Sequence, residues 1–424
     1  MTDIDPTLYP NAESDNQPVD AVSRRRVLAG STAAGAAATA GCLGGGDEPN
    51  REGSTVFVFN TGDGTVSLID TATNEVVGTK HLGLSSSFPS NQYTPQLTDT
   101  ANDTLWLNVD RGVRGLSAGS LSETARFDTG SGANWLEQTP DGQHLVVSAR
   151  EPAHTLYRLD ADPDSDSFGE QTGVIDRTSE GGRGDNDGPG PCDVTIHPDG
   201  QYAYVPDLYG DTLTVVDIPS FEIETQIEVD PVGEAPAEPW MGTISWDGAR
   251  LLVEHNEGDA GSESIWDTSD PANPEEITRL TVDDGLGEGP LTSEIGPESE
   301  VGYVFTPGTN DISVVDLTAG EVTDRLDVGG SAFVGTWDPA RETLYVPVQT
   351  TNEVAVVDHA SRKITDTIAV GDSPYGATAA TVRPQSDNTD ALLAKLAQMG
   401  VFASTAETTY CIGECACGHQ LERD

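Results

Sequence analysis

The residues best suited to chemistry form a cluster of three cysteines and one histidine near the C-terminus. Cys411, Cys415, Cys417 and His419 fall within nine residues, and neighbouring glycines allow the chain to turn back on itself. Three sulfurs and one imidazole can surround a single soft cation, and zinc or copper(I) suits such ligands. The Cys-x-x-x-Cys-x-Cys-x-His spacing matches no zinc-finger pattern. The cluster therefore predicts a copper or zinc site without choosing between the two metals.

Disulfide bonding is the alternative fate of the same thiols. In an oxidising compartment, Cys192 would make the number of available thiols even. Cys415 and Cys417 are too close for an easy bond, so Cys411 would pair with one of them and Cys192 with the other. That pairing requires the C-terminal tail to fold back towards Cys192. The metal and disulfide interpretations both stay open at this point.

The N-terminal 53 residues resemble an export signal followed by a lipid anchor. Arg24 and Arg25 precede an Ala- and Gly-rich run, as in twin-arginine signals, and Thr39-Ala40-Gly41-Cys42 resembles a lipobox. The run is too poor in large apolar side chains to span a bilayer stably. We expect a signal peptide over residues 1–42, a lipid on the Cys42 thiol after cleavage, and a flexible tether over residues 43–53. The lipid would hold the exported protein on the outer face of the cytoplasmic membrane.

The charge balance is extremely acidic. Seventy-one Asp and Glu residues stand against 21 Lys and Arg residues, which gives a formal net charge of −50. Such a surface resembles that of proteins from extremely halophilic archaea, where carboxylates hold water in concentrated salt. Binding to phosphate groups depends on clustered Lys and Arg, so this composition argues against nucleic acid and anionic lipid as partners.

A repeated unit dominates the rest of the chain, and residues 191–217 are its clearest copy. Three runs rich in β-branched and aromatic residues are separated there by Pro198-Asp199-Gly200 and Tyr209-Gly210-Asp211, both of which are turn sequences. Aligning the residue that ends the third strand of each copy gives seven copies, with Ser117 as a degenerate member. These residues are Asp70, Ser117, Asp160, Asp217, Asp267, Asp316 and Asp358. Their spacing predicts an all-β, seven-bladed β-propeller over residues 54–384.

The two ends of the repeat region predict how the ring closes. The first copy begins at its second strand, whereas Ser373-Pro374-Tyr375-Gly376 opens a copy that does not continue beyond Pro384. We therefore expect residues 376–382 to form the innermost strand of blade one. Such a strand-swapped closure leaves no open edge at the ends of the ring.

These copies resemble the YVTN-type β-propeller repeat. The motif elements are Ser373-Pro374-Tyr375-Gly376, Pro198-Asp199-Gly200, Tyr204-Val205 and Val66-Ser67-Leu68-Ile69-Asp70. The resemblance covers about three-quarters of the chain and implies the fold, but it says little about activity. Family relatives include exported proteins of unknown role, and similar propellers carry haem d1 in one nitrite reductase class or form part of copper-dependent nitrous oxide reductase.

Ligands of propellers bind at the channel mouth, where the residues leading into the innermost strands converge. The aligned positions, from blade one to blade seven, are Tyr375, Thr94, Asn134, Cys192, Trp240, Leu291 and Phe333. This aromatic and apolar ring either receives a small molecule or a protein ligand, or simply fills the axis. The seven histidines do not occupy equivalent blade positions, and no nucleophile elbow or phosphate-binding glycine loop is present.

A helix and the Cys/His tail occupy residues 385–424 after the ring closes. We expect the helix over residues 390–399, with Thr389 as its N-cap and Gly400 at its end. Its apolar stripe of Leu392, Leu393, Leu396 and Met399 is expected to dock on the propeller.

Two functions follow from these residues. The first is a lipid-anchored propeller at the cell surface that acts as a binding or interaction module, without evident catalysis. The alternative is an extracytoplasmic redox or metal-handling protein that holds copper or zinc in the C-terminal cluster.

Overall fold

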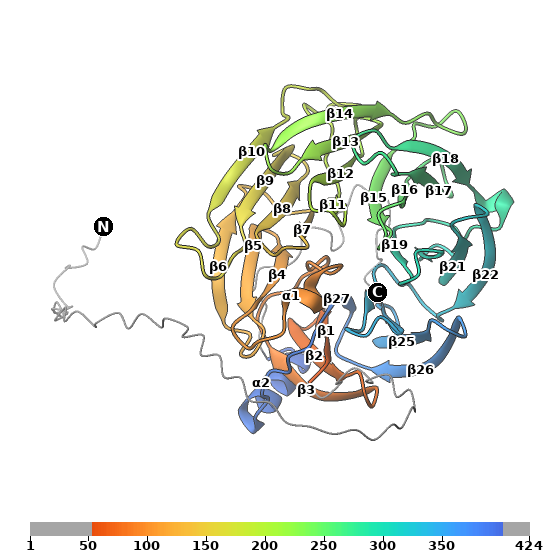
Figure 1. Cartoon of the computed structure of the whole chain (residues 1–424). Coiled ribbons are helices and arrows are strands. Elements are labelled where there is room, and N and C mark those ends of the chain that lie inside the picture. The colour runs from red at the N-terminus through yellow and green to blue at the C-terminus, as the bar shows by residue number, and fades with distance from the viewer. Residues whose placement is uncertain (1–52, 402–424) are drawn as a thin grey trace, which may run out of the picture. The chain divides into compact units, whose positions relative to one another are not determined.

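The computed structural model describes residues 53–401, and these form a ring of seven antiparallel sheets around a central axis (Figure 1). Six sheets have four strands and one has three. The predicted seven-bladed propeller is therefore confirmed.

The blades follow one another along the chain, and the strands of each blade run in order from the axis outward. Blade one contains β27 (Pro374–Ala380), β1 (Thr55–Asn60), β2 (Thr65–Asp70) and β3 (Glu75–His81), and blade two contains β4 (Thr104–Val109), β5 (Gly112–Ser117) and β6 (Glu123–Asp128). Blade three contains β7 (Trp135–Gln138), β8 (His144–Ala149), β9 (Thr155–Asp160) and β10 (Gln171–Asp176). Blade four contains β11 (Thr195–Ile196), β12 (Tyr202–Asp207), β13 (Thr212–Asp217) and β14 (Glu222–Glu228).

The same order continues through the second half of the ring. Blade five contains β15 (Pro239–Ile244), β16 (Arg250–His255), β17 (Ser262–Asp267) and β18 (Glu275–Leu280), with the short 3₁₀ helix η1 (Val282–Asp284) after it. Blade six contains β19 (Thr292–Ile295), β20 (Val301–Thr306), β21 (Asp311–Asp316) and β22 (Glu321–Asp327). Blade seven contains β23 (Thr336–Trp337), β24 (Thr343–Val348), β25 (Glu353–Asp358) and β26 (Lys363–Ala369).

Burial differs between the middle strands and the outer strands of the blades. The middle strand β1 is buried at every residue because its two faces pack against neighbouring blades. The outer strand β14 alternates exposed and half-buried residues, as a strand with one solvated face should. Apolar cores between the blades therefore hold the ring together.

The residue predicted to end each third strand does end it in all seven blades. In the six blades where this residue is Asp, its carboxylate fixes the following turn: Asp217 Oδ1 accepts a hydrogen bond from the Ser220 amide at 2.7 Å, and Asp358 Oδ1 accepts one from the Ser361 amide at 2.8 Å. These short-range bonds explain why the repeat can be recognised from turn residues alone.

Ring closure also follows the prediction. Strand β27 pairs antiparallel with β1, with Ala380 opposite Thr55 and Gly376 opposite Phe59. The strand begins two residues earlier than the predicted 376–382, at Pro374. The chain thus joins its two ends within one sheet.

Blade two departs from the repeat because its sheet has three strands. The place of a first strand is taken by residues 82–103, which include the short helix α1 (Thr94–Leu97). This segment turns into the middle of the ring, where α1 is drawn in orange (Figure 1).

The C-terminal helix α2 (Asn388–Gln398) packs against β3, but its start and its buried face differ from the prediction. Asp387 rather than Thr389 is the N-cap, and its carboxylate accepts hydrogen bonds from the amides of Thr389 and Asp390 at 2.7 and 2.9 Å. The buried residues are Ala394 and Ala397, because small side chains let the helix approach the sheet.

The predicted apolar stripe of α2 is therefore only partly correct. Leu393 and Leu396 are half-buried, as a docked stripe requires. Leu392 is 57% exposed and Met399 is 68% exposed.

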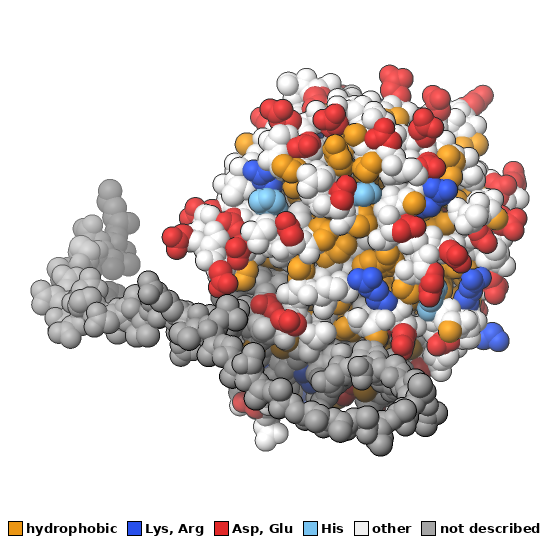
Figure 2. All heavy atoms as spheres, in the orientation of Figure 1, with side chains coloured by type: hydrophobic (Ala, Val, Ile, Leu, Met, Phe, Trp, Pro, Cys, Tyr) orange, Lys and Arg blue, Asp and Glu red, His pale blue; other side chains and the backbone are white. Residues whose placement is uncertain are grey.

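Acidic side chains are spread over the face of the ring shown in Figure 2, and basic side chains are few. Apolar side chains gather towards the centre of that face (Figure 2). In the described part of the chain, no helix is long and apolar enough to cross a membrane.

Candidate functional site in the axis of the ring

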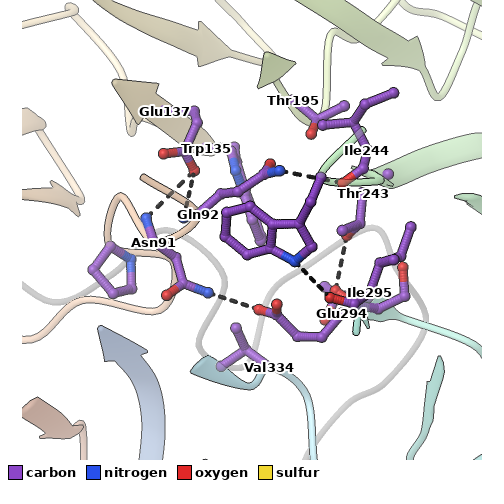
Figure 3. Close-up of a pocket in the computed structure, with 15 residues that line it drawn as sticks. Asn91, Gln92, Trp135, Glu137, Thr195, Thr243, Ile244, Glu294, Ile295 and Val334 are labelled. Carbon is purple, nitrogen blue, oxygen red and sulfur yellow. Dashed lines mark hydrogen bonds between the residues drawn. The ribbon is translucent and has the colours of Figure 1, made fainter. Parts of the chain in front are cut away.

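Residues 88–93 pass through the axis of the ring, and we call them the axial segment. Phe88 packs among the mouth residues, whereas the Tyr93 hydroxyl donates a hydrogen bond of 2.7 Å to Ile196 O at the far end of β11. Between them, Asn91 and Gln92 contact the innermost strands of several blades (Figure 3). The missing first strand of blade two is thus replaced by chain that fills the channel.

The mouth residues named from the sequence meet in one apolar cluster. Cys192, Trp240, Leu291, Phe333 and Tyr375 all belong to it, and none is more than 5% exposed. The rings of Phe333 and Tyr375 are stacked, with centroids 4.9 Å apart.

The sequence alignment was wrong for blade two. Phe88 fills its place at the mouth, edge-on to Tyr375 at 5.6 Å between ring centroids, whereas Thr94 lies in α1. The alignment failed because blade two has no first strand to align.

The Cys192 thiol is fully buried beside two hydrogen-bond donors. Asn134 Nδ2 lies 3.2 Å from Cys192 Sγ and also donates to the Cys192 carbonyl oxygen, while Arg150 Nη1 lies 3.7 Å from the sulfur. The thiol is therefore part of a packed polar contact at the mouth. Pairing it with a tail cysteine would require this end of the ring to open.

Farther from the mouth, six of the innermost strands carry a hydrogen-bonding side chain at the same repeat position. Each of these residues pairs with the third residue of the second strand of its blade. The six are Glu137, Thr195, Thr243, Glu294, Thr336 and Thr378. Four blades thus carry threonine, and blades three and six carry glutamate.

This ring of side chains holds the axial segment. Ser90 Oγ donates to Glu137 Oε1 at 2.9 Å, and the Thr378 hydroxyl donates to the Ser90 carbonyl at 2.8 Å. Asn91 Nδ2 donates to Glu294 Oε1 at 2.7 Å (Figure 3). The Thr336 hydroxyl donates to Asn91 Oδ1. The segment is therefore bonded to blades one, three, six and seven.

The two axial glutamates are buried, and burial raises the pKa of both. The pKa of Glu137 rises to about 7, although hydrogen bonds from Ser90 and from the amides of Asn91, Gln92 and Gln138 oppose the effect. Burial, with the nearby Glu137 carboxylate, raises the pKa of Glu294 well above its ordinary range. Burial therefore favours the protonated form of both carboxyls, and with a pKa of about 7 Glu137 is partly protonated at neutral pH.

Little space remains beside the axial segment. The cavity there has a volume of about 30 Å³ and is lined by Asn91, Gln92, Glu137, Thr243 and Glu294, among others (Figure 3). A single water needs roughly 10 to 15 Å³ by the same measure, whereas ligand pockets measure hundreds of Å³. The axis can hold about two waters but no metabolite.

Three further carboxyls are buried towards the mouth end of blades four and five. Glu254 on β16 lies directly opposite Glu263 on β17, and both are fully buried. Burial raises the pKa of Glu254 to about 8. Burial, together with the nearby Glu254 carboxylate, raises the pKa of Glu263 well above its ordinary range. The pKa of Asp193 is also raised by burial. At least one proton is therefore held within this group at neutral pH.

The remaining predicted sites lie outside the described residues. Arg24, Arg25 and Cys42 precede residue 53, and Cys411, Cys415, Cys417 and His419 follow residue 401. Within residues 53–401, no group of three or more His, Cys, Asp or Glu side chains is arranged to hold a metal ion.

Asn91, Gln92, Glu137 and Glu294 were missed by the sequence analysis. A signal was available for the two glutamates, because an acidic residue replaces threonine at one aligned repeat position. No such signal exists for Asn91 and Gln92, since they belong to no repeat.

No protein-family model matches the sequence, and a search of curated proteins finds no relative. Solved structures do resemble the fold. Hydrazine synthase of Kuenenia stuttgartiensis aligns with a TM-score of 0.58 at 16% identity, over 73% of this chain and 94% of that one.

Two lactonase structures are similar to the same degree. The periplasmic gluconolactonase PpgL of Pseudomonas aeruginosa has a TM-score of 0.60 at 16% identity, over 77% of this chain and 98% of that chain. A putative 6-phosphogluconolactonase of Bacteroides fragilis has a TM-score of 0.61 at 16% identity, over 78% and 99%. At this identity the likeness establishes that the chain is a seven-bladed β-propeller.

Proposed function

We propose that the protein is an exported, lipid-anchored propeller that acts as a binding or interaction module on the outer face of the cytoplasmic membrane. The observation that carries this proposal is the filled axis. Residues 88–93 occupy the channel, and the cavity beside them measures about 30 Å³. The surfaces left for a partner are the two outer faces of the ring.

On the mouth face, a protein partner fits better than a small molecule. Trp240, Phe333, Tyr375 and Cys192 are buried in one cluster with Phe88, so a small molecule would have to open that cluster to reach them. A protein can instead contact the loops around the mouth and leave the packing intact. The net charge of −50 argues against nucleic acid as a partner.

Localisation is tested in a host that exports twin-arginine substrates and lipidates exported cysteines. Replacing Arg24 and Arg25 by Lys should leave the protein in the cytoplasm, and Cys42→Ser should release exported protein from the membrane. Arg26→Lys is the matched control because it changes the neighbouring arginine outside the pair. Membrane-bound Cys42→Ser protein would contradict the lipid anchor.

Turnover of a lactone separates a binding module from an enzyme of the kind named among the structural neighbours. We expect the full-length chain to leave D-glucono-1,5-lactone at its spontaneous hydrolysis rate, because the axial cavity is too small for the sugar. Acceleration that is lost in Glu137→Gln or Glu294→Gln would refute the module and assign the axis a catalytic role.

The second candidate is metal handling by the C-terminal cluster, favoured by three cysteines and one histidine within nine residues. Protein purified anaerobically should then contain one equivalent of copper or zinc. A variant with Cys411, Cys415 and Cys417 changed to Ser should contain none, whereas Cys192→Ser should keep the metal. Wild-type protein without metal and with its thiols paired would refute this candidate.

A further inference from the structure

The end of the axis opposite the mouth carries a stacked arginine and tryptophan from two blades that are not neighbours in the ring. Arg341 lies in the turn between β23 and β24 of blade seven, and Trp246 follows β15 of blade five. The guanidinium carbon of Arg341 is 3.6 Å from the centroid of the Trp246 ring. The Trp246 indole donates a hydrogen bond of 2.9 Å to Ile295 O, which holds the ring in place.

Both residues are departures from the repeat. In blades three, four, five and six, the residue two positions before the second strand has positive φ and is small. These residues are Gly142 (φ 74°), Gly200 (φ 73°), Gly248 (φ 74°) and Ser299 (φ 63°). Arg341 takes this left-handed position in blade seven with φ 59°, although a side chain is unfavourable there.

Trp246 departs from the same turn in its own blade. Two residues before the left-handed position, blades three, four, six and seven have proline, at Pro140, Pro198, Pro297 and Pro339. Blade five has Trp246. Trp246 and Arg341, which both depart from the same turn pattern, thus contact each other in space. The chemistry of the two turns does not require this contact.

The guanidinium of Arg341 has few acceptors for a group that is half-buried. Buried arginines elsewhere in the described chain are paired with carboxylates, as Arg177 is with Asp207 and Arg279 with Glu257. Arg341 has no ion pair among residues 53–401, and its Nη2 donates to the Gln96 amide oxygen at 3.0 Å when that amide is oriented to suit its neighbours. Most of its five N–H donors thus lack an acceptor among the described residues.

The charges around Arg341 also indicate that the guanidinium lacks a carboxylate partner in the described part of the chain. Burial lowers the pKa of the Arg341 guanidinium, and the group that opposes this is the Tyr93 phenol rather than a carboxylate. A half-buried cation without a counter-charge in residues 53–401 is unusual in a chain with 71 acidic residues. An anion brought to this position would supply the missing charge.

We propose that Arg341, backed by Trp246, binds the carboxylate of a small molecule on the face opposite the mouth. The planar guanidinium matches a carboxylate with two parallel hydrogen bonds, and stacking on Trp246 holds its plane fixed. A singly charged carboxylate suits the site better than a phosphate dianion, because the acidic surface repels the second charge. This site is separate from the mouth and from the lipid anchor, so its failure would leave both of those proposals standing.

The test is calorimetric titration of the full-length chain with D-gluconate, in concentrated salt at constant ionic strength, with sorbitol as the uncharged counterpart. Wild type should bind gluconate and not sorbitol. Arg341→Gln and Arg341→Lys should each weaken gluconate binding at least tenfold, because Gln lacks the charge and Lys lacks the planar fork.

The matched control is Arg362→Gln. Arg362 lies in the same blade, also has positive φ, and is exposed, so the change removes the same charge without touching the stack. Its affinity for gluconate should stay within twofold of wild type. Absence of gluconate binding by wild type, equal binding of sorbitol, or equal losses in the Arg341 and Arg362 variants would each overturn the proposal.

Arg341→Gly separates a binding role from a structural one. It restores the residue that three other blades use in this turn, so the melting temperature should not fall while gluconate binding is lost. A melting temperature lowered by several degrees with unchanged gluconate binding would make the stack structural and overturn the proposal.

Discussion

The two ends of the ring axis are both built from turns and strand ends of the repeat, but one end is apolar and closed and the other is polar. At the mouth, Phe88 closes an apolar cluster in which Phe333 and Tyr375 are stacked and no member of the ring of mouth residues is more than 5% exposed. At the other end, Arg341 and Trp246 are half-buried, and Trp246 lines a small polar cavity. One fold can therefore close its channel at one end and leave polar groups accessible at the other.

The two ends differ because different residues depart from the repeat at each end. At the mouth, the break is the axial segment of blade two, which brings an aromatic side chain to a position that no strand fills. At the opposite end, the breaks are single substitutions in turns, where Trp246 replaces a proline and Arg341 a glycine. A change in a turn leaves the sheets intact, so this end can vary without loss of the core.

The largest expected effect on stability comes from removing β27, the innermost strand of blade one. A chain ending at Ser373 lacks β27 and leaves β1 without its inner partner. We expect loss of cooperative thermal unfolding by circular dichroism. A chain ending at Pro384 keeps β27 without α2 and should still unfold cooperatively, and equal protease resistance of the two would show that β27 is dispensable.

The next effect tests the closure of the mouth. Phe88→Ala removes a buried ring that contacts Trp135 at 4.4 Å and Tyr375 at 5.6 Å between centroids. Denaturant unfolding should give a loss of about 3–5 kcal/mol, as for other buried Phe→Ala changes. Val77→Ala on the exposed face of β3 is the control and should cost less than about 1 kcal/mol. A small loss at Phe88 would mean that the mouth is not held shut by packing.

The buried carboxyls near the mouth predict an unusual pH dependence. The pKa of Glu254 is raised to about 8 in the folded chain, so its protonation stabilises the fold fully below its ordinary pKa of 4.5, and this contribution disappears as the pH rises through 8. The free energy of unfolding should fall by up to about 1.4 kcal/mol per pH unit for this group between pH 6 and 8.

Glu254→Gln should make that slope shallower, because Gln does not titrate, while other buried carboxyls such as Glu263 still contribute to it. Repulsion between surface carboxylates changes with pH in the same direction, so the control is Glu75→Gln, which removes an exposed carboxyl on β3 and should leave the slope as in wild type. Parallel curves for wild type and Glu254→Gln from pH 6 to 8 would contradict the raised pKa.

The smallest effect is expected at the turns on the face opposite the mouth. Asp316 Oδ1 accepts hydrogen bonds from the amides of Thr318 and Ala319 at 2.9 and 2.8 Å, and Asp316→Ala should cost about 1 kcal/mol by thermal unfolding. Asp324→Ala, at an exposed position of β22, serves as the comparison. A loss as large as that of Phe88→Ala would mean that both ends of the ring are equally important to its stability.

Most of the fold could be predicted because its signals are local. The residue that ends each third strand was correct in seven blades, and in six of them it is an Asp whose carboxylate bonds two or three residues ahead and needs no distant partner. The start of α2 was missed by two residues because Asp387 and Thr389 are both good caps, and only the reciprocal bonds with Asp390 select Asp387.

The axial site could be predicted only in part. Tyr375, Cys192, Trp240 and Phe333 meet in one cluster as expected, because each lies at the start of an innermost strand or just before it. Whether a partner binds over them stays a prediction, as do the lipid on Cys42 and the metal at Cys411, Cys415, Cys417 and His419.

By itself, the sequence determined the number of blades, the turn residues and the strand that closes the ring, because strand period and turn chemistry act over a few residues. Only the tertiary structure decided that residues 88–93 fill the axis and that Arg341 meets Trp246. The space inside a ring, and contacts between blades five and seven, exist only after all seven blades have closed around the axis.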